Sequence, residues 1–163
     1  MKTRPVERED ARAICDIYNH YVKETTITFE EDAVSADEMA DRIEKITSSH
    51  PWFVLEEEGE LVAYAYASPW RVRSAYRFSS ELTVYVHKDW RGRGFGSAIY
   101  SHLIQTMIDK GAHCLYGGIA LPNEGSAAIH EKLGFSKCGH FHEVGFKFGK
   151  WIDVGYWEKV ISV

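Results

Sequence analysis

Residues 87–104 read "HKDWRGRGFGSAIYSHLI", and Arg91–Gly96 place three glycines and two arginines in six consecutive positions. Ile99, Leu103 and Met107 then recur every four residues, the spacing of a helix with one apolar face. A tight turn that happens to be basic is one interpretation of this start. The other is a binding site for a phosphate, because the first N–H groups of a helix are unpaired and its dipole favours an anion.

The loop fits neither of two common nucleotide-binding motifs. No Lys-Ser/Thr pair follows its last glycine, as a nucleoside-triphosphate loop requires, and the GxGxxG spacing of a dinucleotide fold is absent. No acidic metal pair stands beside it, which disfavours a nucleotide phosphotransferase. A pyrophosphate held without a metal stays open, because glycine amides could face its oxygens while Arg91 and Arg93 add charge.

The composition indicates a single globular domain, residues 1–163. The chain is 45% hydrophobic and 26% charged with a net charge of −5, so we expect no nucleic-acid or membrane partner. No apolar stretch has the length of a membrane span or signal peptide. Cys15, Cys114 and Cys138 lack CxxC spacing, which favours buried free thiols in a cytoplasmic protein.

Segments with helical and strand periodicity alternate along the chain. We expect helices over residues 9–23, from 36 onward, from 97 to about Gly111, and over 123–132. Strands are expected in a hairpin over 51–69, over 79–88 and 113–121, and as two long strands in the tail 135–163. The expected order is roughly β-α-α-β-β-β-α-β-α-β-β, beginning with a strand, and this alternation favours an α/β or α+β sheet flanked by helices.

A second motif, "LPNEGSAAIHEKLGF", occupies residues 121–135. The glycine loop resembles the acetyl-CoA loop of the GNAT superfamily of N-acetyltransferases, Arg/Gln-x-x-Gly-x-Gly/Ala, and this second motif resembles the Asn-led helix of the same superfamily. The segments 17–31, 66–86, 121–135 and 145–159 together resemble the phosphinothricin acetyltransferase branch and its amino-acid N-acyltransferase relatives.

The resemblance implies both a fold and an activity. The fold is a single GNAT-like domain of the α+β (α/β-type) class, with a central mixed, mostly antiparallel twisted sheet of about seven strands flanked by about four helices. The activity is acetyl-CoA-dependent N-acetylation of the α-amine of a small amino acid, or of a phosphinothricin, methionine sulfoximine or methionine sulfone type of analogue. Acetyl-CoA would be the cosubstrate, the acceptor a small-molecule amine, and the protein a homodimer.

Glu81 is the expected general base. A primary amine is mostly ammonium at neutral pH, so direct transfer from a thioester needs a group that accepts a proton. Glu81 stands in "SSELTVYV", on the strand face opposite Leu82, Val84 and Val86, and the family places its base there. A solvated strand carboxylate is the alternative. We expect Glu81 to act directly or through one water.

His130 is the second catalytic candidate. Many superfamily members carry Tyr at this helix position, near the coenzyme A sulfur, whereas the phosphinothricin branch carries His. An imidazole could protonate the departing thiolate. A structural histidine with satisfied hydrogen bonds is an equally good interpretation.

The resemblance also implies the coenzyme A contacts. The backbone of the strand would pair with the pantetheine arm, the glycine loop would bind the pyrophosphate, and the helix after Asn123 would complete the site. The implied residues are Thr83, Val84, Tyr85, Val86, Arg91, Gly92, Arg93, Gly94, Phe95, Gly96, Ser97, Asn123 and Ser126. Asn123 is at the same time the expected N-cap of its helix.

For the acceptor, the branch uses an aromatic residue at Phe29 and an arginine at Arg73, and Tyr76 and Tyr85 are further candidates for the pocket. A guanidinium suits a carboxylate or phosphinate. Arg71 and Arg77 are interpreted as surface charges.

Two features of the tail need an interpretation. His140 and His142 share a strand face, but no third ligand is apparent in the sequence, so we expect exposed strand residues and no metal. The tail aromatic residues, Phe146, Phe148, Trp151, Tyr156 and Trp157, are expected in the core and in a subunit contact.

A non-catalytic acyl-CoA-binding module is the alternative function. It would keep the glycine loop and lack turnover. The joint presence of Glu81, Asn123 and His130 favours the enzyme.

Overall fold

The computed structural model describes residues 1–162. Its strands and α-helices follow the order that the sequence predicts, including the strand at the N-terminus. They are β1 (Lys2–Pro5), α1 (Ala11–Glu24), α2 (Ala36–Thr47), β2 (Trp52–Glu57), β3 (Glu60–Pro69), β4 (Ser79–Val86), α3 (Phe95–Asp109), β5 (Cys114–Ala120), α4 (Glu124–Lys132), β6 (Ser136–Lys147) and β7 (Lys150–Val160).

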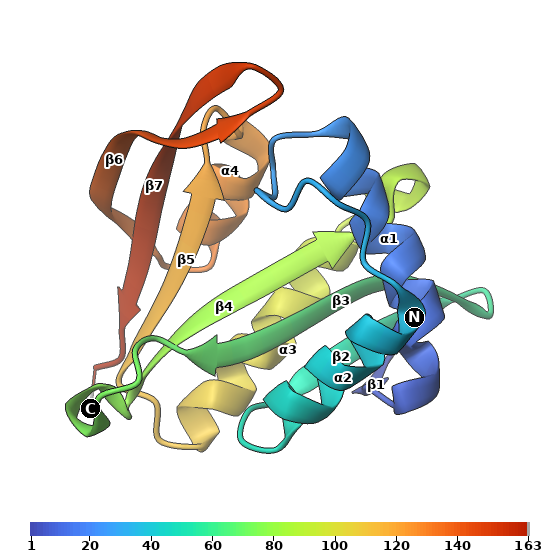
Figure 1. The fold of residues 1–163 in the computed structure, drawn as a ribbon. Helices are drawn as coiled ribbons and strands as arrows, with labels where there is room; N and C mark the ends of the chain where they lie inside the picture. The colour runs from blue at the N-terminus through green and yellow to red at the C-terminus, as the bar shows by residue number, and fades with distance from the viewer. Residues whose placement is uncertain (163) are drawn as a thin grey trace.

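The strands form one seven-stranded sheet in the order β1-β2-β3-β4-β5-β7-β6. Neighbours are antiparallel except β4 and β5, which run parallel. The expected α+β domain, with a mixed and mostly antiparallel sheet and four α-helices, is therefore confirmed (Figure 1).

Helices cover both faces of the sheet and define two cores. On one face α1 and α2 bury Ile14, Val22 and Met39 against Val54 of β2. On the other face the α3 residues Ile99, Leu103 and Met107 are buried with strand residues such as Leu115 of β5. The helix spacing read from the sequence thus identifies the buried stripe of α3.

Strand β4 divides its side chains between these two cores. Leu82 is buried in the α3 core and Val84 packs against it, whereas Tyr85 packs against the α1 core. Glu81 shares the face of Tyr85, because side chains alternate along a strand. The general-base candidate is therefore on the α1 side of the sheet.

The sheet forks between β4 and β5. The two strands pair over Ser79–Glu81 and Cys114–Tyr116, and beyond Glu81 they diverge, as Figure 1 shows. β5 stays paired with β7 along its whole length, from Cys114 to Ala120. The second half of β4 therefore presents a strand edge to an open wedge, with Glu81 at its apex.

Local signals set the boundaries of several elements. Ser35 caps α2 by accepting a hydrogen bond from the Glu38 amide (3.1 Å). Glu58 and Gly59 join β2 to β3 with φ angles of 53° and 82°, as a two-residue hairpin turn requires.

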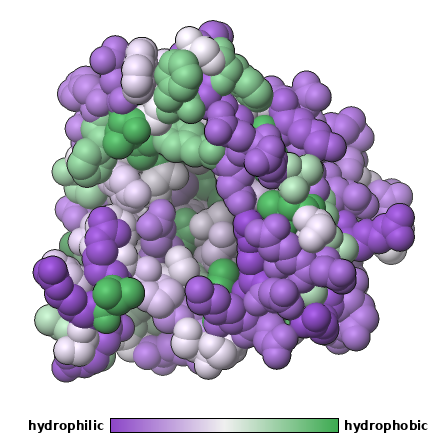
Figure 2. Space-filling view, in the orientation of Figure 1, coloured by the Kyte–Doolittle hydropathy of each residue, from purple (hydrophilic) through white to green (hydrophobic). Residues whose placement is uncertain are grey.

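One expectation for the cysteines is wrong, and the tail aromatic residues divide between the core and the surface. Cys15 and Cys114 are buried, but Cys138 is exposed because it lies on β6 at the edge of the sheet. Trp157 is in the core, whereas Phe146, Phe148 and Trp151 are exposed on the hairpin of β6 and β7. Figure 2 shows hydrophobic side chains gathered over this hairpin, above a hollow in the surface. None of the helices within residues 1–162 has the length and apolar character to cross a membrane.

Candidate active site

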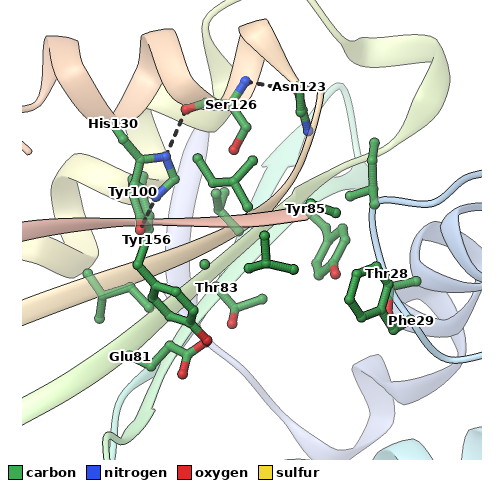
Figure 3. A pocket seen from close by; sticks show the side chains of 17 residues that line it. Thr28, Phe29, Glu81, Thr83, Tyr85, Tyr100, Asn123, Ser126, His130 and Tyr156 are labelled. Carbon is green, nitrogen blue, oxygen red and sulfur yellow. Dashed lines mark hydrogen bonds between the residues drawn. The ribbon is translucent and has the colours of Figure 1, made fainter. Parts of the chain in front are cut away.

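A cavity of about 300 Å³ occupies the fork of the sheet. Its walls come from β4, β5, β7, α4 and the segment 27–29, which follows α1 (Figure 3). Elements that are distant in the chain meet here because β4 and β5 diverge.

Glu81 lies at the apex of this cavity, on the last residue pair of the β4–β5 ladder. Burial raises the pKa of its carboxyl group, and the nearby guanidinium of Arg71 acts in the opposite direction. Burial and, after it, the charge of Glu81 raise the pKa of Tyr156, whose ring lines the same cavity (Figure 3). A carboxylate with a raised pKa in a cleft is suited to general-base chemistry near neutral pH.

The glycine loop and the start of α3 form a second cavity of about 480 Å³. Gly92 and Gly94 have φ angles of 75° and 84°, which L side chains rarely adopt. Gly94 is the N-cap of α3 and its carbonyl accepts the Ala98 amide (3.0 Å). The amides of the first helical turn lie before this bond and have no intrahelical acceptor, so they are available to an anion.

Gly96 sets how closely α3 approaches β4 and α4. A Cβ atom at Gly96 would lie 3.2 Å from Val86 Cγ2 and 3.7 Å from Ile129 Cδ1. A glycine here therefore lets the helix N-terminus lie directly against the edge of β4.

The structure brings together nearly all residues that the sequence assigns to coenzyme A. One group lines the fork cavity: Thr83, Val84, Tyr85, Asn123 and Ser126. The second cavity is lined by Val84, Tyr85, Val86, Arg91, Gly92, Gly94, Phe95, Gly96, Ser97, Asn123 and Ser126. Arg93 is not among the described residues of either lining; it is exposed, and its guanidinium lies 4.8 Å from the centre of the Trp90 ring.

Asn123 has the dual position that the sequence suggests. Its Oδ1 accepts a hydrogen bond from the Ser126 amide (3.1 Å) and so caps α4, while its side chain lines both cavities. The cap fixes the amide group at the boundary between them (Figure 3).

His130 is a buried histidine with both ring nitrogens bonded. Nδ1 lies 2.8 Å from the Ser126 carbonyl oxygen, and Nε2 lies 2.8 Å from the Tyr100 hydroxyl (Figure 3). Because a carbonyl oxygen accepts, Nδ1 must carry the proton, so in the neutral ring Nε2 accepts from Tyr100. Burial lowers the pKa of His130, which favours this neutral form.

Two residues that hold the His130 ring in place were not predicted from the sequence. Tyr100 comes from α3 and lines the fork cavity. Gly117 of β5 leaves room for the ring, since a Cβ atom there would lie 2.3 Å from His130 Nε2. Neither position has a local motif that would have identified it.

A third cavity of about 480 Å³ adjoins the fork through Phe29, Val154 and Tyr156. Its aromatic lining comes from several elements, and Arg71 supplies a positive charge at its edge. The aromatic residues are Phe29, Trp70, Tyr116, Phe141 and Tyr156. This cavity has no described lining residue in common with the cavity at the glycine loop.

The residues expected to contact the acceptor divide into two groups. Phe29 and Tyr85 line the fork cavity. Arg73 and Tyr76 are exposed in the loop between β3 and β4, and neither is among the described residues that line these three cavities. Arg71, interpreted as a surface charge, is exposed but lines the aromatic cavity and has its guanidinium 4.3 Å from the centre of the Trp70 ring.

A buried lysine holds the segment that carries Phe29 in place. Lys147 of β6 is 1% exposed and donates a hydrogen bond to the Thr28 carbonyl oxygen (2.8 Å). The Thr28 hydroxyl is bonded to Tyr18 of α1 (2.8 Å). Close to these contacts, a Cβ atom at Gly145 would lie 2.4 Å from the Phe29 ring. These contacts join the β6–β7 hairpin to the wall of the cavity.

The sheet is mixed and forked, the N-terminus of α3 lies beside the open part of β4, and Glu81 lies at the apex of the fork. The model of the GNAT acetyltransferase domain matches residues 3–155. The chain belongs to this family, and it is an N-acetyltransferase.

Known proteins are similar in sequence to this chain over nearly its full length. It is 38% identical over 159 residues to a phosphinothricin N-acetyltransferase of Streptomyces viridochromogenes, covering 98% of this chain and 87% of the relative. It is 36% identical to the L-amino acid N-acyltransferase MnaT of Escherichia coli, covering 96% and 91%. The crystal structure of a phosphinothricin acetyltransferase from Sinorhizobium meliloti in complex with acetyl-CoA has a TM-score of 0.94 at 35% identity, covering 98% and 88%.

Proposed function

We propose that this protein transfers an acetyl group from acetyl-CoA to the α-amine of a small amino acid or of a glutamate- or methionine-like analogue. The observation that carries this proposal is the position of Glu81 at the apex of the fork cavity, which shares lining residues with the cavity at α3 and with the aromatic cavity. The names of the relatives, which include phosphinothricin and amino acid acyltransferases, support this acceptor class.

The donor side fits a pyrophosphate and an extended arm. The amides at the N-terminus of α3 would hold the pyrophosphate, with Arg91 at the rim of the same cavity. The open edge of β4 offers backbone groups to the amides of a pantetheine chain, in the manner of an added strand. Asn123 would hydrogen-bond that chain from the opposite wall.

Glu81 would accept the proton of the acceptor ammonium, directly or through one water. The freed amine attacks the thioester carbonyl carbon, a C–N bond forms, and the C–S bond breaks as the thiolate leaves. The nitrogen then loses its second proton to the thiolate, which gives the amide and free coenzyme A. A backbone N–H of β4 would polarise the carbonyl oxygen. The raised pKa of Glu81 increases its basicity, so proton transfer from an ammonium group is less unfavourable than to an exposed carboxylate.

His130 would act by positioning Tyr100, because its neutral ring has no proton at Nε2 to pass toward the thiolate. The neutral ring accepts at Nε2, so the proton that points along this contact belongs to the Tyr100 hydroxyl. Tyr100 lines the fork cavity, and because its one hydroxyl proton is directed to His130, its oxygen can accept a hydrogen bond there. The role that we propose for His130 is to fix Tyr100 and the start of α4.

The acceptor would enter from the aromatic cavity. Its carboxylate or phosphinate would pair with Arg71, the arginine that lines this cavity, and its side chain would lie against Phe29 and Tyr156. Arg73 stays a candidate for the same anion from the exposed loop, as the family resemblance implies.

We further propose a homodimer that covers the exposed side chains of the β6–β7 hairpin. Phe146, Phe148 and Trp151 are 55%, 56% and 66% exposed, an unusual exposure for three neighbouring aromatic residues. Trp151→Glu should shift the mass measured by light scattering from dimer to monomer. A wild-type monomer at micromolar concentration would contradict this proposal.

The decisive experiment is thiol release from acetyl-CoA with a panel of amines: phosphinothricin, methionine sulfoximine, methionine sulfone and the ordinary amino acids. We expect turnover with at least one α-amine, and acetyl-CoA binding unchanged but turnover largely lost in Glu81→Gln. Binding of coenzyme A without thiol release for any amine would favour the non-catalytic acyl-CoA-binding module instead.

A further inference from the structure

His140, His142 and Asp153 converge on the outer face of the β6–β7 hairpin. Their ligand atoms, one from each residue, all lie within 4.8 Å of one another. The sequence shows the two histidines two residues apart but gives no third ligand. The structure supplies it from the neighbouring strand.

The register of the two strands explains the convergence. His140 is opposite Gly155 and Phe141 is opposite Val154, so His142 begins the bulge that faces Asp153. Side chains two residues apart point to the same face of a strand. The next regular pair is Gly145 with Ile152, so three residues of β6 stand opposite Asp153 alone. Bulges of this kind redirect side chains.

The Asp153 carboxylate is already oriented toward the histidines. The Glu143 amide donates a hydrogen bond to Oδ1 (2.7 Å), and Oδ2 lies 2.8 Å from His140 Nε2. The His140 and His142 rings are stacked with their centres 4.4 Å apart. A backbone donor that fixes one carboxylate oxygen is the kind of outer contact that orients metal ligands.

We infer that these three side chains form a binding site for a divalent transition cation such as Zn²⁺. Two imidazoles and one carboxylate suit Zn²⁺, Ni²⁺ or Cu²⁺ and are poor ligands for Ca²⁺. Ligand atoms about 2.0–2.2 Å from Zn²⁺ in a tetrahedron lie roughly 3.3 Å apart. Rotation of the two exposed histidine side chains can bring the ligand atoms from within 4.8 Å to this shorter separation, and water would complete the coordination.

Binding changes the contacts of one histidine. The cation takes the place of the hydrogen bond between His140 Nε2 and Asp153, and the ring proton moves to Nδ1. Lys137 now has its ammonium 2.9 Å from that Nδ1. Lys137 is exposed, so it can turn into solvent when the cation binds.

The site stands apart from the proposed chemistry. Phe141 and Val154, which alternate with the ligands along β6 and β7, line the aromatic cavity on the other face of the hairpin. A bound cation would fix the two strands and the bulge between them, and would not contact the reacting atoms. Its role is structural, and the proposal does not depend on the acetyltransferase assignment.

The test is titration of the tag-free, chelator-treated protein with Zn²⁺ in a calorimeter. The wild type should bind one ion per chain. His142→Gln and Asp153→Asn should each weaken binding by about 10–100-fold or more, since loss of an outer contact alone costs that much. His113→Gln, which removes an exposed histidine elsewhere, should leave binding unchanged.

Co²⁺ gives a second readout, because ligation by His142 and Asp153 should produce visible absorption bands that both variants lose. Circular dichroism of the variants should match the wild type, since all three ligands are on the surface of the hairpin. No saturable binding, equal binding by all four proteins, or one ion per two chains would overturn the intrachain site.

Discussion

Gly117→Ala should destabilise the protein through His130. The added Cβ atom would lie 2.3 Å from His130 Nε2, 2.8 Å from its Cδ2 and 3.3 Å from the Tyr100 hydroxyl oxygen. The first two distances are below any ordinary contact, so the imidazole has to move. It is held between the Ser126 carbonyl and Tyr100, and it is 4% exposed. The ring therefore cannot move without losing contacts.

The magnitude follows from these contacts. Overpacking a core costs about 1–3 kcal/mol, and a weakened buried hydrogen bond adds about 0.5–1.5 kcal/mol. We expect a loss of about 2–4 kcal/mol in the free energy of unfolding. For a domain of this size that corresponds to a fall of roughly 5–15 °C in Tm.

Urea denaturation followed by tryptophan fluorescence measures this loss. Gly139→Ala is the matched control, because a Cβ atom there meets nothing closer than Tyr156 Cβ at 4.0 Å. That control should stay within about 0.5 kcal/mol of the wild type. In a His130→Ala background, Gly117→Ala should cost much less, since the obstructing ring is gone. Equal stability of Gly117→Ala and the control would refute the packing argument.

Three further outcomes follow from the geometry. Gly94→Ala and Gly59→Ala place Ala at φ angles of 84° and 82°, with no atom within 4 Å of the new Cβ, so each variant should lose about 1–2 kcal/mol of stability. Only Gly94→Ala should weaken acetyl-CoA binding in calorimetry, and equal affinities of the two variants would contradict the phosphate site. Lys147→Met should raise the KM for the acceptor and leave the KM for acetyl-CoA unchanged, because the Thr28 carbonyl loses its hydrogen-bond donor. Lys150 is exposed and pairs with Lys147 in the hairpin, and Lys150→Met should change neither KM. The pKa of Glu81 is higher in the folded state than in the unfolded state, so stability falls as pH rises from the unfolded pKa through the folded pKa. Glu81→Gln should therefore be more stable than the wild type at pH 7 and match it at a pH below the unfolded pKa of about 4.3. If denaturation curves give the same stability difference between variant and wild type at both pH values, this explanation is wrong.

Local chemistry made much of the fold predictable. Apolar spacing located α3, the Ser35 cap located the start of α2, and the Glu58–Gly59 turn located the hairpin of β2 and β3. These signals act over a few residues, so a single sequence carries them. The sequence also predicted the glycine loop and the cap at Asn123, because each depends on residues that are close neighbours in the chain.

The remaining parts of the site depend on contacts between distant segments. Tyr100 and His130 are 30 residues apart, and nothing local to either predicts the hydrogen bond between them. The loop between β3 and β4 has no periodicity, so the sequence could not tell that Arg71 lines a cavity while Arg73 is exposed. Alternation in β6 and β7 predicted strands but not which aromatic residues stay exposed at the sheet edge.

The proposed catalysis depends on the N-terminus of α3, which would hold the pyrophosphate of acetyl-CoA and so place its thioester beside Glu81. A crystal structure of the protein with acetyl-CoA tests this arrangement. We expect pyrophosphate oxygens on the amides of residues 94–97, the pantetheine along residues 83–86, and the thioester in the fork next to Glu81. Acetyl-CoA bound elsewhere, with its thioester outside the fork, would rule this arrangement out.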